Sequence, residues 1–206
     1  GVLQRRVKND EELEHLRAVQ KITEATMEMA CSLIARAPAD AEGVLQHEGA
    51  ALTSERVRQL ISRFVLDHDC TTLHDSIVVT VPHVADCHHF GTGPLRKDLP
   101  VIVDIFPTHN HTHYCGDCTR TVVNGDVSDI VRDMHACVVR ANAAGCAALQ
   151  PGTTGQAVHE AVAAVIREDG YSMGAPTSEK DEEWIGMRHG TGHGIGLDVH
   201  EPILLA

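Results

Sequence analysis

The sequence predicts an α+β fold, and three observations favour that class. Apolar residues recur at helical spacing in four segments, β-branched residues form extended runs between them, and a helix, turn, helix, strand order occurs twice. The repeated order fits an internally duplicated fold, and the alternative is a coincidence of common residues. With 206 residues, 43% of them hydrophobic, the chain is long enough to bury one core, so we expect a single domain over residues 1–206.

Two helices are expected in the first third of the chain. The first begins after Asn9, which forms a capping box with Glu12, and runs to about Arg36. The second begins at Thr53 or Ser54, either of which is a good N-cap. Its apolar residues recur at helical spacing and predict one buried stripe, formed by Val57, Leu60, Ile61, Phe64 and Val65.

Two further helices and three strands complete the expected layout. The third helix opens at Ser128 and stops before Pro151, and the fourth runs from Thr153, in a second capping box with Gln156, to Gly170. One apolar face is expected on the third helix, made of Ile130, Val131, Met134, Cys137 and Val138. Extended β-branched runs predict strands over residues 76–81, 100–105 and 114–123.

Charge and hydropathy exclude several classes of function. The formal net charge is -12 and no run of Lys or Arg offers a basic patch, so we expect no nucleic-acid partner. No window reaches the roughly 18 to 20 apolar residues of a membrane span, and the charged start lacks the apolar middle of a secretory signal. We therefore expect a cytoplasmic protein with no membrane partner. Seven cysteines in a chain too large to need disulfides favour reduced thiols.

The stretch THNHTHYCGDCTRT at residues 108–121 gathers three histidines and two cysteines. Cys115 and Cys118 match a CxxC pair, but a redox pair needs its first cysteine at a helix N-terminus, and this context is strand-like. A zinc site would recruit His109, His111 or His113, yet ligands crowded on one short loop lack the usual spacing. The histidines are expected to decorate an exposed turn between two strands.

Two aspartates flank this turn. Asp104 ends the apolar run VIVD, and Asp117 lies in the segment CGDC. An ionised carboxylate at the end of a buried strand is costly unless it is paired or bound to a metal. Two such carboxylates facing each other across a hairpin would hold divalent cations, and aspartate oxygens can bridge a metal pair. The alternative is that both aspartates cap backbone N–H groups in turns.

Glycines alternate with other residues in RHGTGHGIGLDVHEP at residues 188–202. They let the backbone approach a ligand closely, and three histidines, His189, His193 and His200, lie among them. The glycines exclude a helical HExxH site, and no register of them gives the dinucleotide-binding pattern GxGxxG. A further polar segment, DCHHFGTGP at residues 86–94, precedes the strand that carries Asp104.

In this order the motifs resemble those of the pita-bread metallopeptidases, which include Xaa-Pro aminopeptidase, prolidase and methionine aminopeptidase. The matching pieces are VDIFP at residues 103–107, YCGDCTRT at 114–121 and GHGIGLDVHEP at 192–202, and the resemblance covers nearly the whole chain. LDVHE and DIFP are nearest to the proline-directed aminopeptidase branch. The resemblance implies a pita-bread (creatinase/aminopeptidase-like) fold with an internal pseudo-twofold duplication.

The resemblance also implies roles for individual residues. Asp104, Asp117 and His193 would be ligands of two divalent metal ions (Mn, Co, Zn or Fe), with Asp117 bridging them. His200 would donate to the scissile carbonyl or its oxyanion, and His189 would line the substrate pocket. Both carboxylate and imidazole ligands suit first-row divalent ions, whose identity then depends on availability.

A second catalytic histidine is implied in the DCHH segment. His88 would steady the substrate or the developing charge, and His89 is its close competitor. In the mechanism that the resemblance implies, a metal-bridged water or hydroxide attacks the peptide carbonyl while imidazoles stabilise the tetrahedral oxyanion.

Two features depart from the family pattern. The loop between Asp104 and Asp117 is longer than the commonest family spacing and contains the extra histidines. The family also needs two further glutamates, and the chain ends before either; Glu201 does not match their positions. We therefore expect a C-terminally incomplete catalytic domain that is inactive or weakly metallated as isolated.

The function implied by the resemblance is metal-dependent hydrolysis of the N-terminal residue of peptides, at Xaa-Pro bonds. Competing functions are methionine aminopeptidase or prolidase activity, a non-catalytic pita-bread binding module, creatinase-like chemistry without metal, and a small structural zinc protein built on Cys115 and Cys118. The expected partner is a peptide substrate, and assembly into a homo-oligomer is an open alternative.

Overall fold

The computed structural model describes residues 2–176 and 184–206, and the chain divides into two compact units. Residues 7–128 and 195–199 form one, which we call the sheet unit. Residues 1–6, 129–194 and 200–206 form the other, which we call the hairpin unit.

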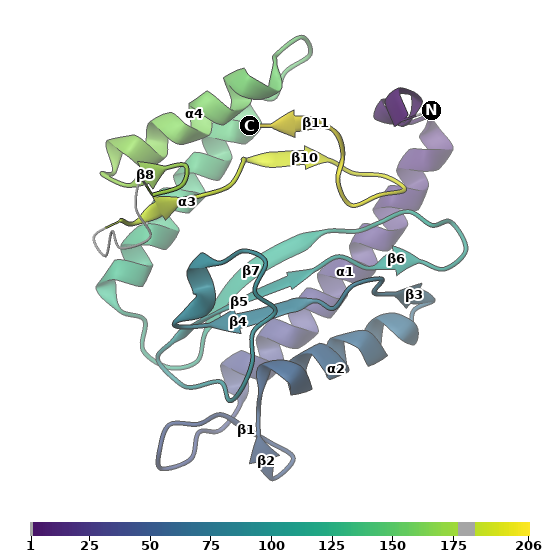
Figure 1. The fold of residues 1–206 in the computed structure, drawn as a ribbon. Coiled ribbons are helices and arrows are strands. Elements are labelled where there is room, and N and C mark those ends of the chain that lie inside the picture. Colours follow the sequence, from purple (N-terminus) through teal and green to yellow (C-terminus); the bar gives the residue numbers. More distant parts are fainter. Residues whose placement is uncertain (1, 177–183) are drawn as a thin grey trace. The chain divides into compact units, whose positions relative to one another are not determined.

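Three antiparallel strands form the centre of the sheet unit, in the order β4 (Ile77–Thr80), β5 (Pro100–Ile105), β7 (Cys118–Val123). Helix α1 (Asp10–Arg36) packs on β5 and β7, and helix α2 (Ser54–Leu66) packs on β4 (Figure 1). The first two strands lie where the sequence predicts them. The third begins at Cys118 rather than at residue 114, because pairing with β5 ends at Ile105 and the following Pro107 has no N–H to extend the ladder.

Both helices of the sheet unit begin at the predicted caps. The Asn9 side chain accepts from the Glu12 N–H at 2.9 Å, and the Glu12 carboxylate accepts from the Asn9 N–H at 2.8 Å, which confirms the capping box. Helix α2 is capped by Thr53, whose hydroxyl accepts from the Arg56 N–H. Of the stripe predicted on α2, three residues are fully buried: Val57, Ile61 and Val65.

Burial alternates along β5. Val101, Val103 and Ile105 are fully buried in the core shared with α1 and α2, whereas Ile102 and Asp104 are half-buried on the opposite face. This alternation follows from the two-residue period of a strand, so the hydrophobic core itself aims Asp104 away from the helices. Short elements close the unit: β1 (Gln46–His47), β2 (Ala50–Ala51), β3 (Cys70–Thr71), β6 (Thr108–His109) and the 3₁₀ helix η2 (His83–Ala85).

The hairpin unit consists of two packed helices and short strands. Helices α3 (Asp129–Ala148) and α4 (Gly155–Glu168) pack on each other, and β10 (Gly192–Gly194) pairs antiparallel with β11 (Glu201–Leu205) (Figure 1). Strand β8 (Ser172–Met173) runs parallel to β9 (Gly186–Met187), and the 3₁₀ helix η1 (Val2–Arg6) contacts β11.

The apolar face predicted on α3 is wrong in part. Ile130 and Val138 are 53% and 59% exposed, and the buried residues are the small ones, Cys137, Ala141 and Gly145. Small side chains let α4 approach closely: a Cβ on Gly145 would lie 2.8 Å from a Val162 methyl carbon. The close approach of α4 therefore decides which face of α3 is buried, rather than the size of the apolar side chains on it.

Helix α4 begins one residue later than predicted. Its N-cap is Thr154, whose hydroxyl accepts from the Ala157 N–H, so the expected cap at Thr153 is wrong. The backbone N–H of Thr153 instead donates to the Gln150 carbonyl and closes the turn that precedes the helix.

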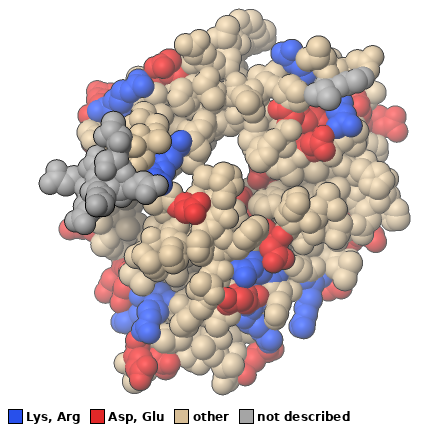
Figure 2. All heavy atoms as spheres, in the orientation of Figure 1, with Lys and Arg blue, Asp and Glu red and all other residues tan. Residues whose placement is uncertain are grey.

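Two surface features bear on the expected partners. Among the residues that the structure describes, no helix is long and apolar enough to cross a membrane. On the face drawn in Figure 2, Lys and Arg side chains are interspersed with Asp and Glu. Both signs of charge therefore alternate over that face rather than gathering into separate regions.

Candidate functional site

Asp104 lies near the end of β5, where it faces β7. Its backbone partner across the strand pair is Thr119, and the Thr119 hydroxyl donates to Asp104 Oδ1 at 2.6 Å. This short bond to a charged acceptor orients the carboxylate on the face of the sheet that carries neither α1 nor α2. The threonine belongs to the CTRT segment of the sequence, so a recognisable motif residue supports the aspartate.

Asp117 lies one residue before β7 and two before Thr119. Strand alternation carried one residue beyond the start of β7 puts Asp117 on the same face as Thr119, and so on the same face as Asp104. The main chain of Asp117 is held by Gln20 of α1 through two hydrogen bonds. Sequence reasoning misses Gln20, because the two residues are 97 positions apart and no local pattern signals such a contact.

A tight turn lies between the two aspartates, as the sequence predicts, but of the three histidines only His111 is in it: His109 ends β6 and His113 follows the turn. Residues 110–112 form the turn, His111 is exposed, and His113 adopts a left-handed conformation with φ 62°. The Nδ1 atom of His109 accepts from the Thr112 N–H at 3.2 Å, which anchors that ring to the turn.

All seven cysteines are free thiols, in agreement with the expectation of reduced cysteines. Cys118 is the first residue of β7, and its burial raises the pKa of its thiol. A redox-active CxxC pair needs a lowered thiol pKa, so the raised pKa of Cys118 and the strand context of the pair both disfavour that role.

The two candidate histidines of the DCHH segment differ in their surroundings. His89 stacks on His83 with ring centroids 4.2 Å apart, and its Nδ1 accepts from the Gly91 N–H at 2.9 Å. A ring whose Nδ1 accepts carries its proton on Nε2 when neutral, so His89 presents an N–H donor. His88 is exposed, and its ring lies 3.7 Å from the Cys87 Sγ. Of the two histidines, His89 is therefore the one whose ring is held in a fixed orientation.

His193 and His200 lie together in the hairpin unit. His193 is the central residue of β10, His200 immediately precedes β11, and their ring centroids are 4.3 Å apart in an edge-on arrangement. The Nδ1 of His193 lies 3.0 Å from the Gly194 carbonyl oxygen. Because a carbonyl only accepts, Nδ1 must be the donor, which leaves Nε2 unprotonated in the neutral ring. In that tautomer His193 can bind a metal through Nε2 while its Nδ1–H is held by the main chain.

His189 shows the same local pattern. Its Nδ1 donates to the Gly190 carbonyl at 2.8 Å, so its neutral ring also presents an unprotonated Nε2. Helix α4 supports the strand that follows: the Nδ1 atom of His159 and the Thr191 hydroxyl are 2.9 Å apart. Next to His200, Glu201 is 2% exposed, and its carboxylate lies 4.0 Å from Arg5 of η1.

The donor chemistry of these residues fits divalent cations. Asp104 and Asp117 of the sheet unit carry hard oxygen donors on one face of a strand pair, and His193 of the hairpin unit has an unprotonated Nε2 in its neutral ring. Within residues 2–176 and 184–206, no group of three or more His, Cys, Asp or Glu side chains is gathered closely enough to hold a metal ion.

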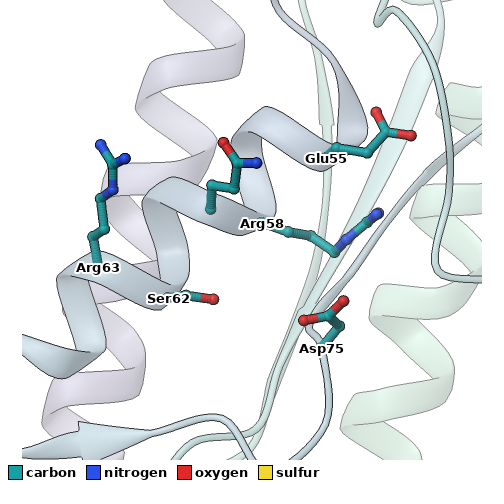
Figure 3. A pocket seen from close by; sticks show the side chains of 6 residues that line it. Glu55, Arg58, Ser62, Arg63 and Asp75 are labelled. Carbon is teal, nitrogen blue, oxygen red and sulfur yellow. The ribbon is translucent and has the colours of Figure 1, made fainter.

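Neither Asp104 nor Asp117 lines the two hollows of the sheet unit. A groove of about 330 Å³ runs along α2 and is polar, with Arg58, Arg63 and Glu55 on the helix and Asp75 opposite (Figure 3). A second hollow, of about 470 Å³, follows α1. It is lined by Leu16, Arg17, Gln20, Lys21, Glu24, Cys115 and Ile195. The second hollow shares Gln20 with the support of Asp117.

Comparison with known proteins shows that the chain is similar to peptidases. Xaa-Pro aminopeptidase 1 of Streptomyces coelicolor is 32% identical over 136 residues, which are 62% of this chain and 28% of that protein. The probable dipeptidase PepE of Mycobacterium tuberculosis is 36% identical over 132 residues, 63% of this chain and 32% of that protein. The chain thus spans only about a third of the length of these curated relatives.

Solved structures of related peptidases identify the fold. The X-Pro aminopeptidase of Thermotoga maritima MSB8 matches with a TM-score of 0.78 and 25% identity, over 99% of this chain and 51% of that one. The fold is the pita-bread fold, as the sequence predicts, and the chain covers about half of the matching structure. The profile of Metallopeptidase family M24 matches residues 14–206, so the chain belongs to the M24 family of metallopeptidases.

Proposed function

We propose that the protein is a metal-dependent aminopeptidase that removes the N-terminal residue of peptides, at Xaa-Pro bonds. The observation that carries this proposal is the family match, which runs through both units from residue 14 to residue 206 and includes every residue of the candidate site. The same match supports treating both units as parts of one catalytic domain over residues 1–206.

Asp104, Asp117 and His193 are the proposed ligands of two divalent cations. When bound, such cations polarise the scissile carbonyl and lower the pKa of a water molecule toward neutrality. The carboxylates contribute negative charge that retains the cations, and the hydrogen bond from Thr119 keeps Asp104 in one orientation. The Nδ1–H of His193 is held by the Gly194 carbonyl, so the ring need not change tautomer to act as a ligand.

The remaining histidines are assigned to the substrate. His200, whose ring packs edge-on against His193, would donate a hydrogen bond to the scissile carbonyl or to the oxyanion that develops there. His88 would steady the same charge, with His89 as the competitor whose Nε2–H is already fixed. His189 would line the substrate pocket.

The specificity rests on the relatives named above. An Xaa-Pro aminopeptidase favours release of a residue ahead of proline, and the probable dipeptidase PepE favours a prolidase-like choice of dipeptides as the second candidate. Methionine aminopeptidase activity is a third candidate function, and a non-catalytic binding module is a fourth. A cytoplasmic location remains part of the proposal.

A metal and peptide assay separates these candidates. Purified chain is titrated with Mn²⁺, Co²⁺ and Zn²⁺, and then incubated with Xaa-Pro-Xaa tripeptides, Xaa-Pro dipeptides and Met-Xaa peptides. We expect weak metal binding by the 206-residue chain that Asp104→Asn, Asp117→Asn and His193→Ala each reduce, while Asp75→Asn, on the polar groove, does not.

Longer polypeptides that contain this sequence are the place to measure turnover. Metal-dependent cleavage of Xaa-Pro-Xaa peptides supports the proposal, and preference for Xaa-Pro dipeptides moves it to prolidase. Peptide binding without any metal dependence would replace it by the binding module. Loss of metal binding in Asp75→Asn but not in Asp117→Asn would overturn the ligand assignment.

A further inference from the structure

The amide of Gln20 engages both main-chain groups of one residue. Its Oε1 accepts from the Asp117 N–H at 3.1 Å, and its Nε2 donates to the Asp117 carbonyl at 3.2 Å. In an antiparallel sheet, a residue of a hydrogen-bonded pair exchanges the same two bonds with the residue opposite. The side chain of Gln20 therefore acts on Asp117 as a neighbouring strand would.

Asp117 needs such a partner because the ladder stops beside it. Pairing between β5 and β7 ends at Ile105 and Cys118, so no residue of β5 is paired with Asp117. The preceding residues are held in other ways: the Gly116 N–H donates to the Pro107 carbonyl at 2.9 Å, and the Cys115 N–H donates to the Gly196 carbonyl at 2.8 Å. Gln20 supplies the bonds that the strand does not.

Helix α1 is a rigid support for this contact. Val19 and Thr23, which flank Gln20 on the helix, are fully buried. A Cβ on Gly116 would lie 2.1 Å from the Thr23 hydroxyl oxygen, so only glycine lets the chain run this close to the helix. Motion of Asp117 relative to α1 is limited by both contacts.

Glutamine is the side chain that this geometry needs. Its planar amide offers one acceptor and one donor side by side, whereas ionised glutamate offers two acceptors and would turn one toward the Asp117 carbonyl. Asparagine has the same amide but is shorter by one CH₂ group. Methionine has the length of glutamine and can make neither bond.

We propose that Gln20 is a positioning residue for the metal site: its double hydrogen bond fixes the main chain of Asp117 and so the direction in which the carboxylate leaves it. This inference rests on the proposed function, in which Asp117 binds metal. Groups that orient metal ligands typically change metal affinity by about 10- to 100-fold when removed. Gln20 acts through the main chain of the ligand, so we expect the lower end, about 10-fold.

One NMR sample of the ¹⁵N-labelled chain tests both links. Hydrogen exchange of the Asp117 amide reports the hydrogen bond, and line broadening by added Mn²⁺ reports binding near Asp117 even when it is weak. In Gln20→Met we expect the Asp117 amide to exchange about 10-fold faster, and half-maximal broadening to need about 10-fold more Mn²⁺. Gln20→Asn should behave like Gln20→Met because its amide does not reach.

Lys21→Met is the matched control. Lys21 is the next residue of α1, is exposed and lines the same hollow, so its replacement should change neither reading. Circular dichroism confirms that each variant is folded.

The outcomes separate this inference from the proposed function. If Asp117→Asn leaves Mn²⁺ broadening unchanged, the ligand assignment fails and the role of Gln20 fails with it. Suppose that Asp117→Asn weakens Mn²⁺ binding, and that Gln20→Met speeds exchange of the Asp117 amide but leaves Mn²⁺ binding unchanged. Only the positioning role of Gln20 is then refuted. Unchanged amide exchange in Gln20→Met would also refute it.

Discussion

The two units hold the side chains of the candidate site by different means. In the sheet unit, Asp104 projects from a three-stranded sheet whose other face is covered by two helices and a large aliphatic core. In the hairpin unit, His193 projects from two short paired strands laced with glycine, and the core behind them is a small cluster around Cys137, Val162 and Ile166. Asp104 is thus placed by packing of the sheet, and His193 is placed by close backbone contacts.

Core truncation gives the largest expected difference between the units. Ile61→Ala in the sheet unit should lower the free energy of unfolding by about 3 to 4 kcal/mol, because Ile61 is fully buried in the larger core. Ile166→Ala in the hairpin unit should cost about 2 kcal/mol, because Ile166 is buried in the smaller of the two cores.

Urea unfolding followed by two signals checks this prediction. The chain has one tryptophan, Trp184, and it belongs to the hairpin unit, so its fluorescence reports that unit while circular dichroism reports both. Ile61→Ala should shift the circular dichroism midpoint more than the fluorescence midpoint. Equal shifts of both would mean that the two units unfold as one.

Backbone crowding is the next effect in size. A Cβ on Gly155, at the start of α4, would lie 2.2 Å from the Leu204 carbonyl oxygen of β11. Main-chain atoms cannot move aside cheaply, so Gly155→Ala should cost about 2 kcal/mol and lower the Trp184 unfolding midpoint. Gln156→Ala, at the exposed next position, should change little. A Gly155→Ala protein as stable as the parent would show that packing of α4 on β11 does not hold the hairpin.

Helix capping sharpens the same comparison at smaller scale. Asn9→Ala removes a reciprocal capping box from α1 and should cost about 1 kcal/mol. Thr154→Ala removes a single cap from α4 and should cost about 0.5 kcal/mol. Thermal unfolding of both variants measures the two values side by side. A larger loss of stability in Thr154→Ala than in Asn9→Ala would contradict the order predicted from the two caps.

Acid should produce the smallest effect, through Glu55 of the sheet unit. Glu55 accepts from the Thr92 hydroxyl at 2.7 Å and from the Gly93 N–H, and chiefly the Thr92 bond lowers the pKa of Glu55 from 4.5 to about 2. Because the pKa is lower in the folded state, this stabilisation is complete above pH 4.5 and is lost as the pH falls toward 2.

Thr92→Val tests this assignment. The variant should melt at a lower temperature at neutral pH, and its melting temperature should then fall less steeply below pH 4.5 than that of the parent chain. Thr80→Val is the control, because the Thr80 hydroxyl donates to the Pro100 carbonyl and to no titratable group. If the melting temperature of Thr92→Val falls as steeply with pH as that of the parent chain, Glu55 is not the source of the acid sensitivity.

Local signals explain what the sequence could predict. The cap at Asn9 and the strand of Asp104 depend on neighbouring residues, so both appear where their patterns place them. The buried face of α3 depends on how closely α4 approaches at Gly145, which no periodicity contains. The start of β7 depends on the residue that ends its partner strand, so the sequence pattern alone places that boundary too early.

The candidate site divides in the same way. Its histidines and aspartates could be named from ordered motifs, and their roles remain predictions. The tautomer of His193 follows from a carbonyl one residue away and could not be inferred from composition. Gln20 lies 97 residues from the aspartate that it holds, so only the folded chain reveals it.

The bulky side chains that α3 leaves uncovered have a practical consequence. Ile130, Val138 and Val139 are each more than half exposed, although the same helix buries Cys137, Ala141 and Gly145. Exposed apolar side chains of this size favour aggregation at high protein concentration, and the net charge of -12 opposes it by mutual repulsion. Samples should scatter more light as salt is added, and a lysine at position 138 should keep them clear.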